Sequence, residues 1–249
     1  MVKRSKKARS SSITEYIVVL LAYIGIYAGM YYYQLQIQAH AAQTPPEAKE
    51  IPVLLLQNIG SNLLIFIGVG AVLMAIFNRL NLVALTVHER SFTDSVAWVA
   101  VVTLLLVVMN KGIHSAFAAA GAVQEQSPVI TALTEYFSSP LLVLTIGALV
   151  MFLAAGLPEE FMRCYVINNA IRLRSGVSAF VAIAITSVAF GAGHYYQGVE
   201  AMVSIGAIGL VLGIVYYIRQ SFWTQVFIHT FYNVVVLLLP VLTFHKIQP

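Results

Sequence analysis

Apolar runs alternate with short polar connections along most of the chain, and each run is close to the roughly 20 residues that a membrane-spanning helix needs. The runs cover approximately residues 14–37, 52–77, 95–110, 139–157, 177–194, 199–218 and 222–244. The pattern predicts an all-α fold, a polytopic transmembrane helix bundle of about seven helices within a range of six to eight. Because no internal repeat or low-complexity linker interrupts it, we expect residues 1–249 to form a single integral membrane domain.

Two regions do not fit a simple series of spans. Residues 139–174 are too many for one straight span at 1.5 Å rise per residue, and Gly156 with Pro158 predicts a break, after which the proline starts a new helical segment. Glu159 and Glu160 would then lie in a first turn, where the helix dipole favours negative charge. Residues 111–138 mix apolar and polar positions at helical spacing, which predicts an interfacial helix or a re-entrant segment.

Composition agrees with a membrane protein, since 59% of the residues are hydrophobic, 10% are charged and the mean hydropathy is +0.84. The single cysteine, Cys164, excludes an internal disulfide framework and a Cys-rich metal site. The formal net charge of +4 comes largely from the first nine residues. We interpret residues 1–12 as a basic N-terminus that stays in the cytoplasm. The protein is then expected in the cell (plasma) membrane, and no nucleic-acid partner is expected. A cleaved signal peptide is the weaker alternative, because the first apolar run is too long for one.

Three polar pairs lie within or beside the spans of the C-terminal half, and the members of each pair are four residues apart. They are Glu159 with Arg163, Phe190 with His194, and His229 with Asn233. Residues at this spacing share one face of a helix. An ionisable group inside a span costs about 2.5–3.5 kcal/mol on insertion scales, so such groups normally face a polar interior. The pairs are therefore predicted to meet around one site.

The chemistry that these residue types support is activation of a water molecule. A partly desolvated glutamate is a competent general base, and Arg163 nearby would orient its carboxylate. His194 would help to hold the water, while His229 and Asn233 would donate to the oxyanion that forms when water attacks a peptide carbonyl. The glutamate would then pass its proton to the leaving amine.

Other functions compete with this hypothesis. One glutamate and two histidines also make a zinc set, but the helical signature with two histidines around a glutamate is absent, so zinc is disfavoured and we predict no cofactor. A non-enzymatic membrane protein, such as a peptide-immunity factor or helper subunit, would use the polar residues to hold helices together. A transporter or channel would use the carboxylates as a proton relay.

Over residues 139–240 the motifs resemble the CPBP family of intramembrane endopeptidases, which includes CAAX prenyl proteases and bacteriocin-processing enzymes of the Abi type. The family pattern is Glu-Glu-x-x-x-Arg, then Phe-x-x-x-His, then His-x-x-x-Asn on successive helices. The second and third motifs match, whereas only two residues separate Glu160 from Arg163. Aligned on Arg163, the family's presumed base falls on Pro158; aligned on the glutamate pair, it falls on Glu159. The choice of base between Glu159 and Glu160 stays open.

The resemblance implies a glutamate-dependent endopeptidase without an obligatory metal, which cuts a protein or peptide delivered by the membrane near its cytoplasmic side. It implies as site residues Glu159, Glu160, Arg163, His194, His229 and Asn233. Membrane lipid and a protein or peptide substrate are the expected partners. A prenylated C-terminus and a peptide that is processed without lipid both agree with the sequence, which gives no oligomeric state.

Overall fold

The computed structural model describes residues 12–43, 47, 49–77, 85, 91–122, 128–173 and 176–244. Helices account for nearly all of these residues, and no strand occurs among them. The basic cluster within residues 1–11 lies outside the described residues, so the predicted cytoplasmic N-terminus is not tested by the fold.

Within the described part of the chain, seven helices or helical stacks are long and apolar enough to cross a membrane. They are α1 (Ile13–Gln43), α2–η1–α3 (Ile51–Asn62, Leu63–Gly68, Val69–Ile76), α4 (Phe92–Ala119), the stack α6–η3–α7–η4–α8 (Pro140–Leu142, Val143–Gly147, Ala148–Val150, Met151–Gly156, Leu157–Arg172), α9 (Gly176–Gly193), α10 (Val199–Arg219) and α11 (Phe222–Phe244). The prediction of an all-α polytopic bundle with about seven spans is confirmed, and the chain is an integral membrane protein.

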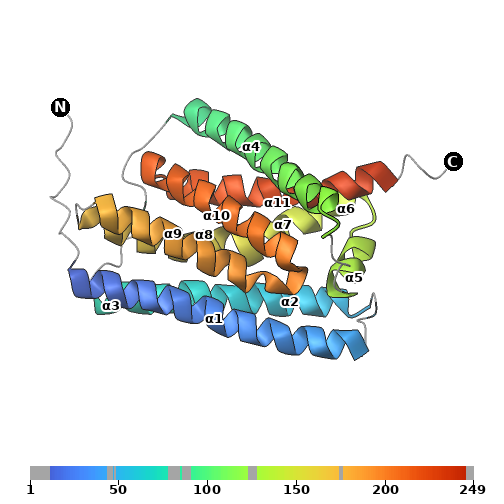
Figure 1. Ribbon diagram of the computed structural model, residues 1–249, viewed down its shortest axis with the longest axis horizontal. Coiled ribbons are helices and arrows are strands. Elements are labelled where there is room, and N and C mark those ends of the chain that lie inside the picture. Colours follow the sequence, from blue (N-terminus) through green and yellow to red (C-terminus); the bar gives the residue numbers. More distant parts are fainter. Residues whose placement is uncertain are drawn as a thin grey trace.

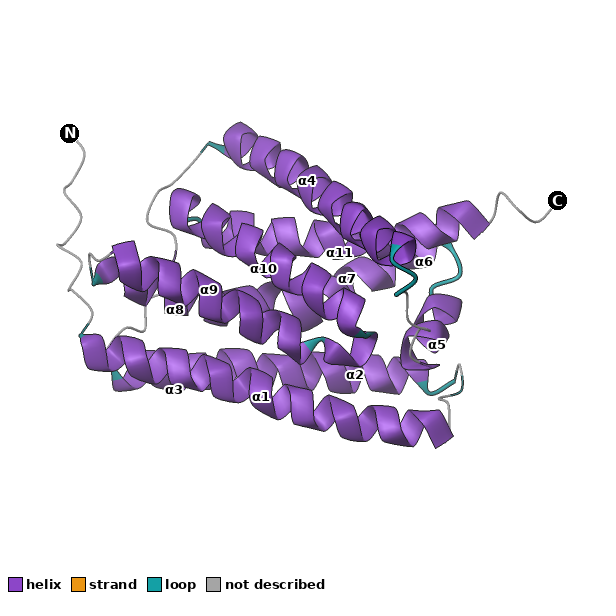
Figure 2. Cartoon of the chain, viewed as in Figure 1, coloured by secondary structure: helices purple, strands orange, loops and turns teal. Residues whose placement is uncertain are grey.

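The helices run roughly side by side along the long axis of the molecule (Figure 1). Helix α1 lies with α2 and α3 along one edge, and α4 lies with α11 along the other, while α8, α9 and α10 lie between them (Figure 2). Within this arrangement α9 packs against α1, α8 and α10, and α11 packs against both α4 and α8. The helices that carry the three sequence motifs are therefore neighbours in space.

The fourth span does not break where the sequence predicts. Residues Pro140–Arg172 form one continuous helical stack of 33 residues, and Gly156 has helical dihedral angles (φ −53°, ψ −51°). Pro158 removes the N–H that would bond the carbonyl four residues earlier, but Asn62 supplies a replacement, since its Nδ2 donates to Ala154 O at 2.6 Å. The π-helical segment η4 directly before α8 accommodates the change in register.

Residues 111–138 divide between two elements. Helix α4 continues to Ala119, well beyond the apolar run at 95–110, and residues Pro128–Tyr136 form the short helix α5. Helix α5 packs against α1 and α2 at one end of the bundle. The first part of this region thus extends a span, which a hydropathy pattern cannot reveal because polar residues interrupt it.

Close approach of α8 to α11 depends on Gly156. A Cβ atom added there would overlap Thr230 Oγ1 and would lie 3.0 Å from Val226 O. Because Thr230 follows His229 directly and Gly156 lies one turn before Glu160, this contact brings the first and third sequence motifs together.

Candidate active site

Glu160 lies at the centre of a buried polar cluster between α8 and α11. Its Oε1 forms an ion pair with Arg163 Nη1 at 3.0 Å and lies 2.8 Å from His229 Nδ1. All three side chains are at most 4% exposed. Arg163 reaches Glu160 from three positions along the helix, a spacing that shares a face as well as four does. The one-residue displacement of the arginine from the family pattern thus leaves the carboxylate and the guanidinium paired.

Glu159 belongs to the same cluster but is held less tightly. Its Oε2 lies 3.7 Å from His229 Nε2, too far for a hydrogen bond, and has no hydrogen-bond partner among the described residues. The side chain is nevertheless buried, with only 5% of its surface exposed. The Oε2 atom of Glu160 likewise has no hydrogen-bond partner among the described residues, so the two carboxylates differ in Oε1 of Glu160, which is held by both a guanidinium and an imidazole.

Helix α9 adds an aromatic wall to this cluster. The Arg163 guanidinium lies over the Phe190 ring, 4.1 Å from its centroid, and the rings of His229 and His194 meet Phe190 edge-on at 5.7 Å and 4.8 Å. The second sequence motif thus borders the first and third, with Phe190 between the two histidines.

His194 has a defined orientation at the end of α9. Its Nδ1 lies 2.8 Å from Phe190 O, a contact in which the ring nitrogen is the donor, so Nε2 is left as an acceptor. Burial disfavours the charged imidazolium and lowers the pKa of His194 to about 4, an effect to which the nearby His229 and Arg163 charges add. The side chain is therefore neutral near pH 7 and able to accept a hydrogen bond from water.

Asn233 shows no such engagement. It is half-buried one turn beyond His229 on α11, and its amide forms no hydrogen bond with the residues that the structure describes. His229 instead directs both ring nitrogens toward glutamates. The expectation that His229 and Asn233 act as paired oxyanion donors stays a prediction.

Sequence reasoning missed the contribution of α1. Tyr23 and Tyr27 pack against each other with ring centroids 4.8 Å apart, and the Tyr27 ring lies edge-on to Phe190 at 5.9 Å. Tyr16, Tyr23 and Tyr27 are spaced by seven and four residues, which places them on one helical face. This row of three tyrosines on one face is the feature of the sequence that could have indicated that α1 packs against the site.

Residues 141–235 match the family model described as type II CAAX prenyl endopeptidase Rce1-like. This region is therefore similar to that family, and we call residues 141–235 the Rce1-like region. The match covers less than half of the chain and contains all six residues that the sequence motifs single out. It confirms the resemblance to CAAX-type intramembrane proteases. No curated protein and no solved structure matches the chain.

Metal ligands do not gather in the Rce1-like region or elsewhere in the described part of the chain. Among those residues no three His, Cys, Asp or Glu side chains converge in a way that would hold a metal ion. The prediction that the protein uses no cofactor rests on the sequence and stays a prediction.

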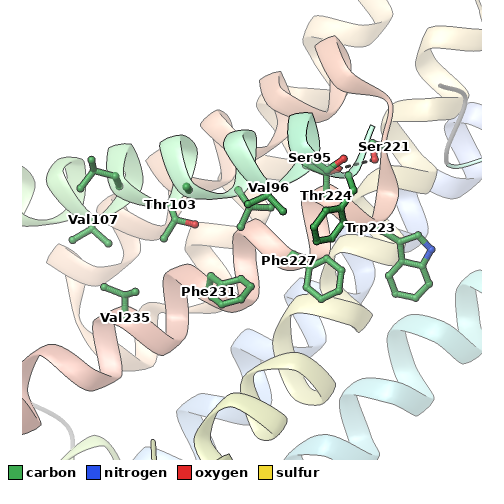
Figure 3. Close-up of a pocket in the computed structure, with 14 residues that line it drawn as sticks. Ser95, Val96, Thr103, Val107, Ser221, Trp223, Thr224, Phe227, Phe231 and Val235 are labelled. Carbon is green, nitrogen blue, oxygen red and sulfur yellow. Dashed lines mark hydrogen bonds between the residues drawn. The ribbon is translucent and has the colours of Figure 1, made fainter. Parts of the chain in front are cut away.

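A separate apolar groove of about 1000 Å³ lies between α4 and α11 (Figure 3). Val96 and Val107 line it from α4, and Phe227 and Phe231 line it from α11. His229 lies between those two phenylalanines in the sequence and therefore faces the opposite side of the helix. None of the residues that line the groove is titratable, so the groove itself offers no acid–base group.

Proposed function

We propose that this protein is an intramembrane glutamate-dependent endopeptidase that hydrolyses a peptide bond in a membrane-delivered protein or peptide. The observation that carries the proposal is the unequal pair of buried carboxylates: Glu160 is held by Arg163 at 3.0 Å and His229 at 2.8 Å, whereas Glu159 comes no closer than 3.7 Å to His229. An acid–base hydrolase needs one group that moves a proton and others that fix its surroundings. The similarity to type II CAAX prenyl endopeptidases supports the same class of reaction.

Glu159 is the proposed general base. Glu160 is a poor candidate because its Oε1 is already held by Arg163 and His229, and these contacts stabilise the ionised carboxylate and oppose its protonation. Glu159 Oε2 lacks such bonds among the described residues and is buried, so proton uptake from water is easier there. The alignment on the glutamate pair agrees with this assignment.

The remaining residues fit supporting roles. Glu160 and Arg163 orient His229 through its Nδ1, which leaves Nε2 as the ring atom that faces Glu159 and the reaction. His194 is proposed to accept a hydrogen bond from the attacking water through Nε2. His229, when protonated at Nε2, and Asn233 on the next turn are proposed to donate to the developing oxyanion.

The proposed reaction proceeds in two proton transfers. Water oxygen forms a bond to the scissile carbonyl carbon as Glu159 takes one water proton, and the carbonyl oxygen becomes an oxyanion. The C–N bond then breaks while Glu159 gives that proton to the amine nitrogen. Two peptides with a new carboxyl and a new amino end are released, and the glutamate returns to its ionised form.

A prenylated CAAX C-terminus is the leading substrate, because the family description names that class. Processing of a peptide without lipid, as in bacteriocin maturation, is the alternative. We further propose that the protein resides in the plasma membrane with a cytoplasmic N-terminus, as the basic N-terminal residues and the positive-inside rule favour.

The test is cleavage by purified protein in proteoliposomes. Two peptides are compared, a farnesylated CAAX peptide and the same sequence without lipid, and the products are identified by mass spectrometry. We expect cleavage of at least the farnesylated peptide by the wild type and a loss of about 100-fold or more in Glu159→Gln, the scale of general-base catalysis. Equal cleavage by wild type and Glu159→Gln overturns the mechanism. If neither peptide is cleaved and His229→Ala lowers only thermal stability, a non-enzymatic role is favoured.

A further inference from the structure

Tyr27 on α1 carries a buried hydroxyl that the mechanism above does not use. The side chain is 2% exposed, and its hydroxyl has no hydrogen bond of standard geometry with any residue that the structure describes, although the Tyr23 side chain lies beside it. Its ring is fixed by aromatic contacts, with Phe66 at 5.4 Å and Phe190 at 5.9 Å between centroids. A fixed, buried donor without a partner is costly for folding, which indicates a use for it in function.

The other tyrosines on the same helical face differ from Tyr27 in this respect. Tyr16 donates its hydroxyl to Ser178 O at 3.1 Å, and Tyr23 donates to Thr186 O at 3.4 Å. Both therefore hold α1 to α9 through backbone carbonyls. Tyr27 lies one turn beyond Tyr23, close to the Glu160 cluster, and it is the member of the stripe whose hydroxyl is not used in that way.

The chain makes room for this ring with a glycine. A Cβ atom added at Gly193 would lie 2.6 Å from Tyr27 Cδ1, so a larger residue there would push the ring away. Gly193 immediately precedes His194, and the Phe190 ring on which Tyr27 packs also contacts Arg163 and His229. Tyr27 therefore packs on the same aromatic ring that borders the proposed site.

We propose that Tyr27 is a catalytic residue that donates a hydrogen bond to the carbonyl oxygen of the scissile peptide bond. This inference rests on the proposed endopeptidase function. As water adds to the carbonyl carbon and Glu159 takes the water proton, negative charge develops on the carbonyl oxygen, and the Tyr27 O–H donates to it. Tyr27 keeps its proton throughout, and the C–N bond breaks when Glu159 protonates the nitrogen. A donor that meets charge only as it develops lowers the barrier without tightening substrate binding.

The test is Tyr27→Phe in the full-length protein in proteoliposomes, which removes the hydroxyl and keeps the ring. We expect kcat to fall about 100-fold, the usual effect of losing one oxyanion donor, with KM and the thermal unfolding midpoint unchanged. Tyr16→Phe is the matched control, since it removes a hydroxyl from the same helical face far from the cluster and should keep wild-type kcat. All variants are assayed below the lowest unfolding midpoint, so that a lower rate cannot result from a loss of folded protein.

The outcomes separate this inference from the function on which it rests. Wild-type kcat in Tyr27→Phe, or a loss confined to KM, overturns the role of Tyr27, provided that Glu159→Gln is inactive in the same preparation. Wild-type kcat in Glu159→Gln overturns the assignment of the general base, and a wild type that cleaves neither peptide overturns the proposed function itself. An equal loss in Tyr16→Phe and Tyr27→Phe also overturns the catalytic role, because it would reflect displacement of α1.

Discussion

Among the arginines that the structure describes, Arg163 and Arg219 are almost fully buried, and each pairs with a carboxylate and an aromatic ring. Arg163 pairs with Glu160 at 3.0 Å and lies over Phe190, whereas Arg219 pairs with Asp94 at 2.6 Å and lies over Trp98 at 4.8 Å. The local chemistry is thus the same. The surroundings differ, because Arg163 lies inside α8 and Arg219 is the last residue of α10.

The difference lies in what else each pair meets. Glu160 is 0% exposed and also contacts His229, with Glu159 beside it, whereas the Asp94 side chain is 40% exposed in the first turn of α4. Solvent can compensate Asp94 if its partner is lost, but nothing comparable compensates Glu160. The two ion pairs thus share their local chemistry but differ in solvent access, and only the Arg163–Glu160 pair is buried together with further ionisable groups.

The largest predicted effect on stability follows from removing the Arg163 charge. Arg163→Met keeps most of the volume but leaves Glu160 buried without its cation, so we expect the free energy of unfolding in detergent to fall by about 3–5 kcal/mol. Denaturant titration followed by circular dichroism measures it. The double variant Arg163→Met/Glu160→Gln should recover part of the loss, because it removes the unpaired charge. No recovery would mean that packing, and not charge, dominates at this position.

An intermediate effect on stability is expected when the pH is lowered, because of His194 beside the Glu160 cluster. Its pKa is lowered to about 4, below the ordinary 6.5, so the unfolded chain binds a proton in this range and the folded protein does not. The free energy of unfolding is therefore highest above about pH 6.5, where His194 is neutral in both states, and it falls as pH drops toward 4, where the unfolded chain binds the extra proton. The thermal unfolding midpoint of the wild type should drop relative to His194→Gln over that interval. A constant difference between the two proteins would contradict the neutral, buried imidazole.

The smallest effect is predicted for Arg219→Met. Asp94 is partly solvated, so loss of its partner should cost about 1 kcal/mol or less in the same unfolding measurement. Peptide cleavage should stay at the wild-type level when it is assayed below the unfolding midpoint. A fall in the free energy of unfolding as large as that of Arg163→Met would contradict this expectation, since it would show that exposure of the carboxylate does not determine the loss of stability.

The number and order of the spans could be predicted because both depend on local apolar content. The continuity of the fourth span could not, because it depends on a distant residue. Pro158 predicts a break on its own, but the carbonyl that it leaves unpaired bonds to Asn62, which is 92 positions away in the sequence. A pattern along the chain contains no information on such a partner.

The residues of the candidate site could be chosen from the sequence because ionisable groups are rare inside spans. Their pairing could not be read in the same way. The spacing of His229 and Asn233 predicts that they act together, but in the structure His229 contacts Glu160, a residue on another helix. Tyr27 escaped notice because a tyrosine in an apolar helix is ordinary, and only the missing hydrogen bond distinguishes it from Tyr16 and Tyr23.

The most direct test of the account compares Glu159→Gln with Glu160→Gln in one preparation, with kcat and the unfolding midpoint measured for both. We expect Glu159→Gln to lose turnover and to keep the wild-type midpoint, because Glu159 moves the proton and is held by few bonds. Glu160→Gln should lower both quantities, because it weakens the contacts to Arg163 and His229. Wild-type turnover in Glu159→Gln, with inactivity confined to Glu160→Gln, would contradict the account.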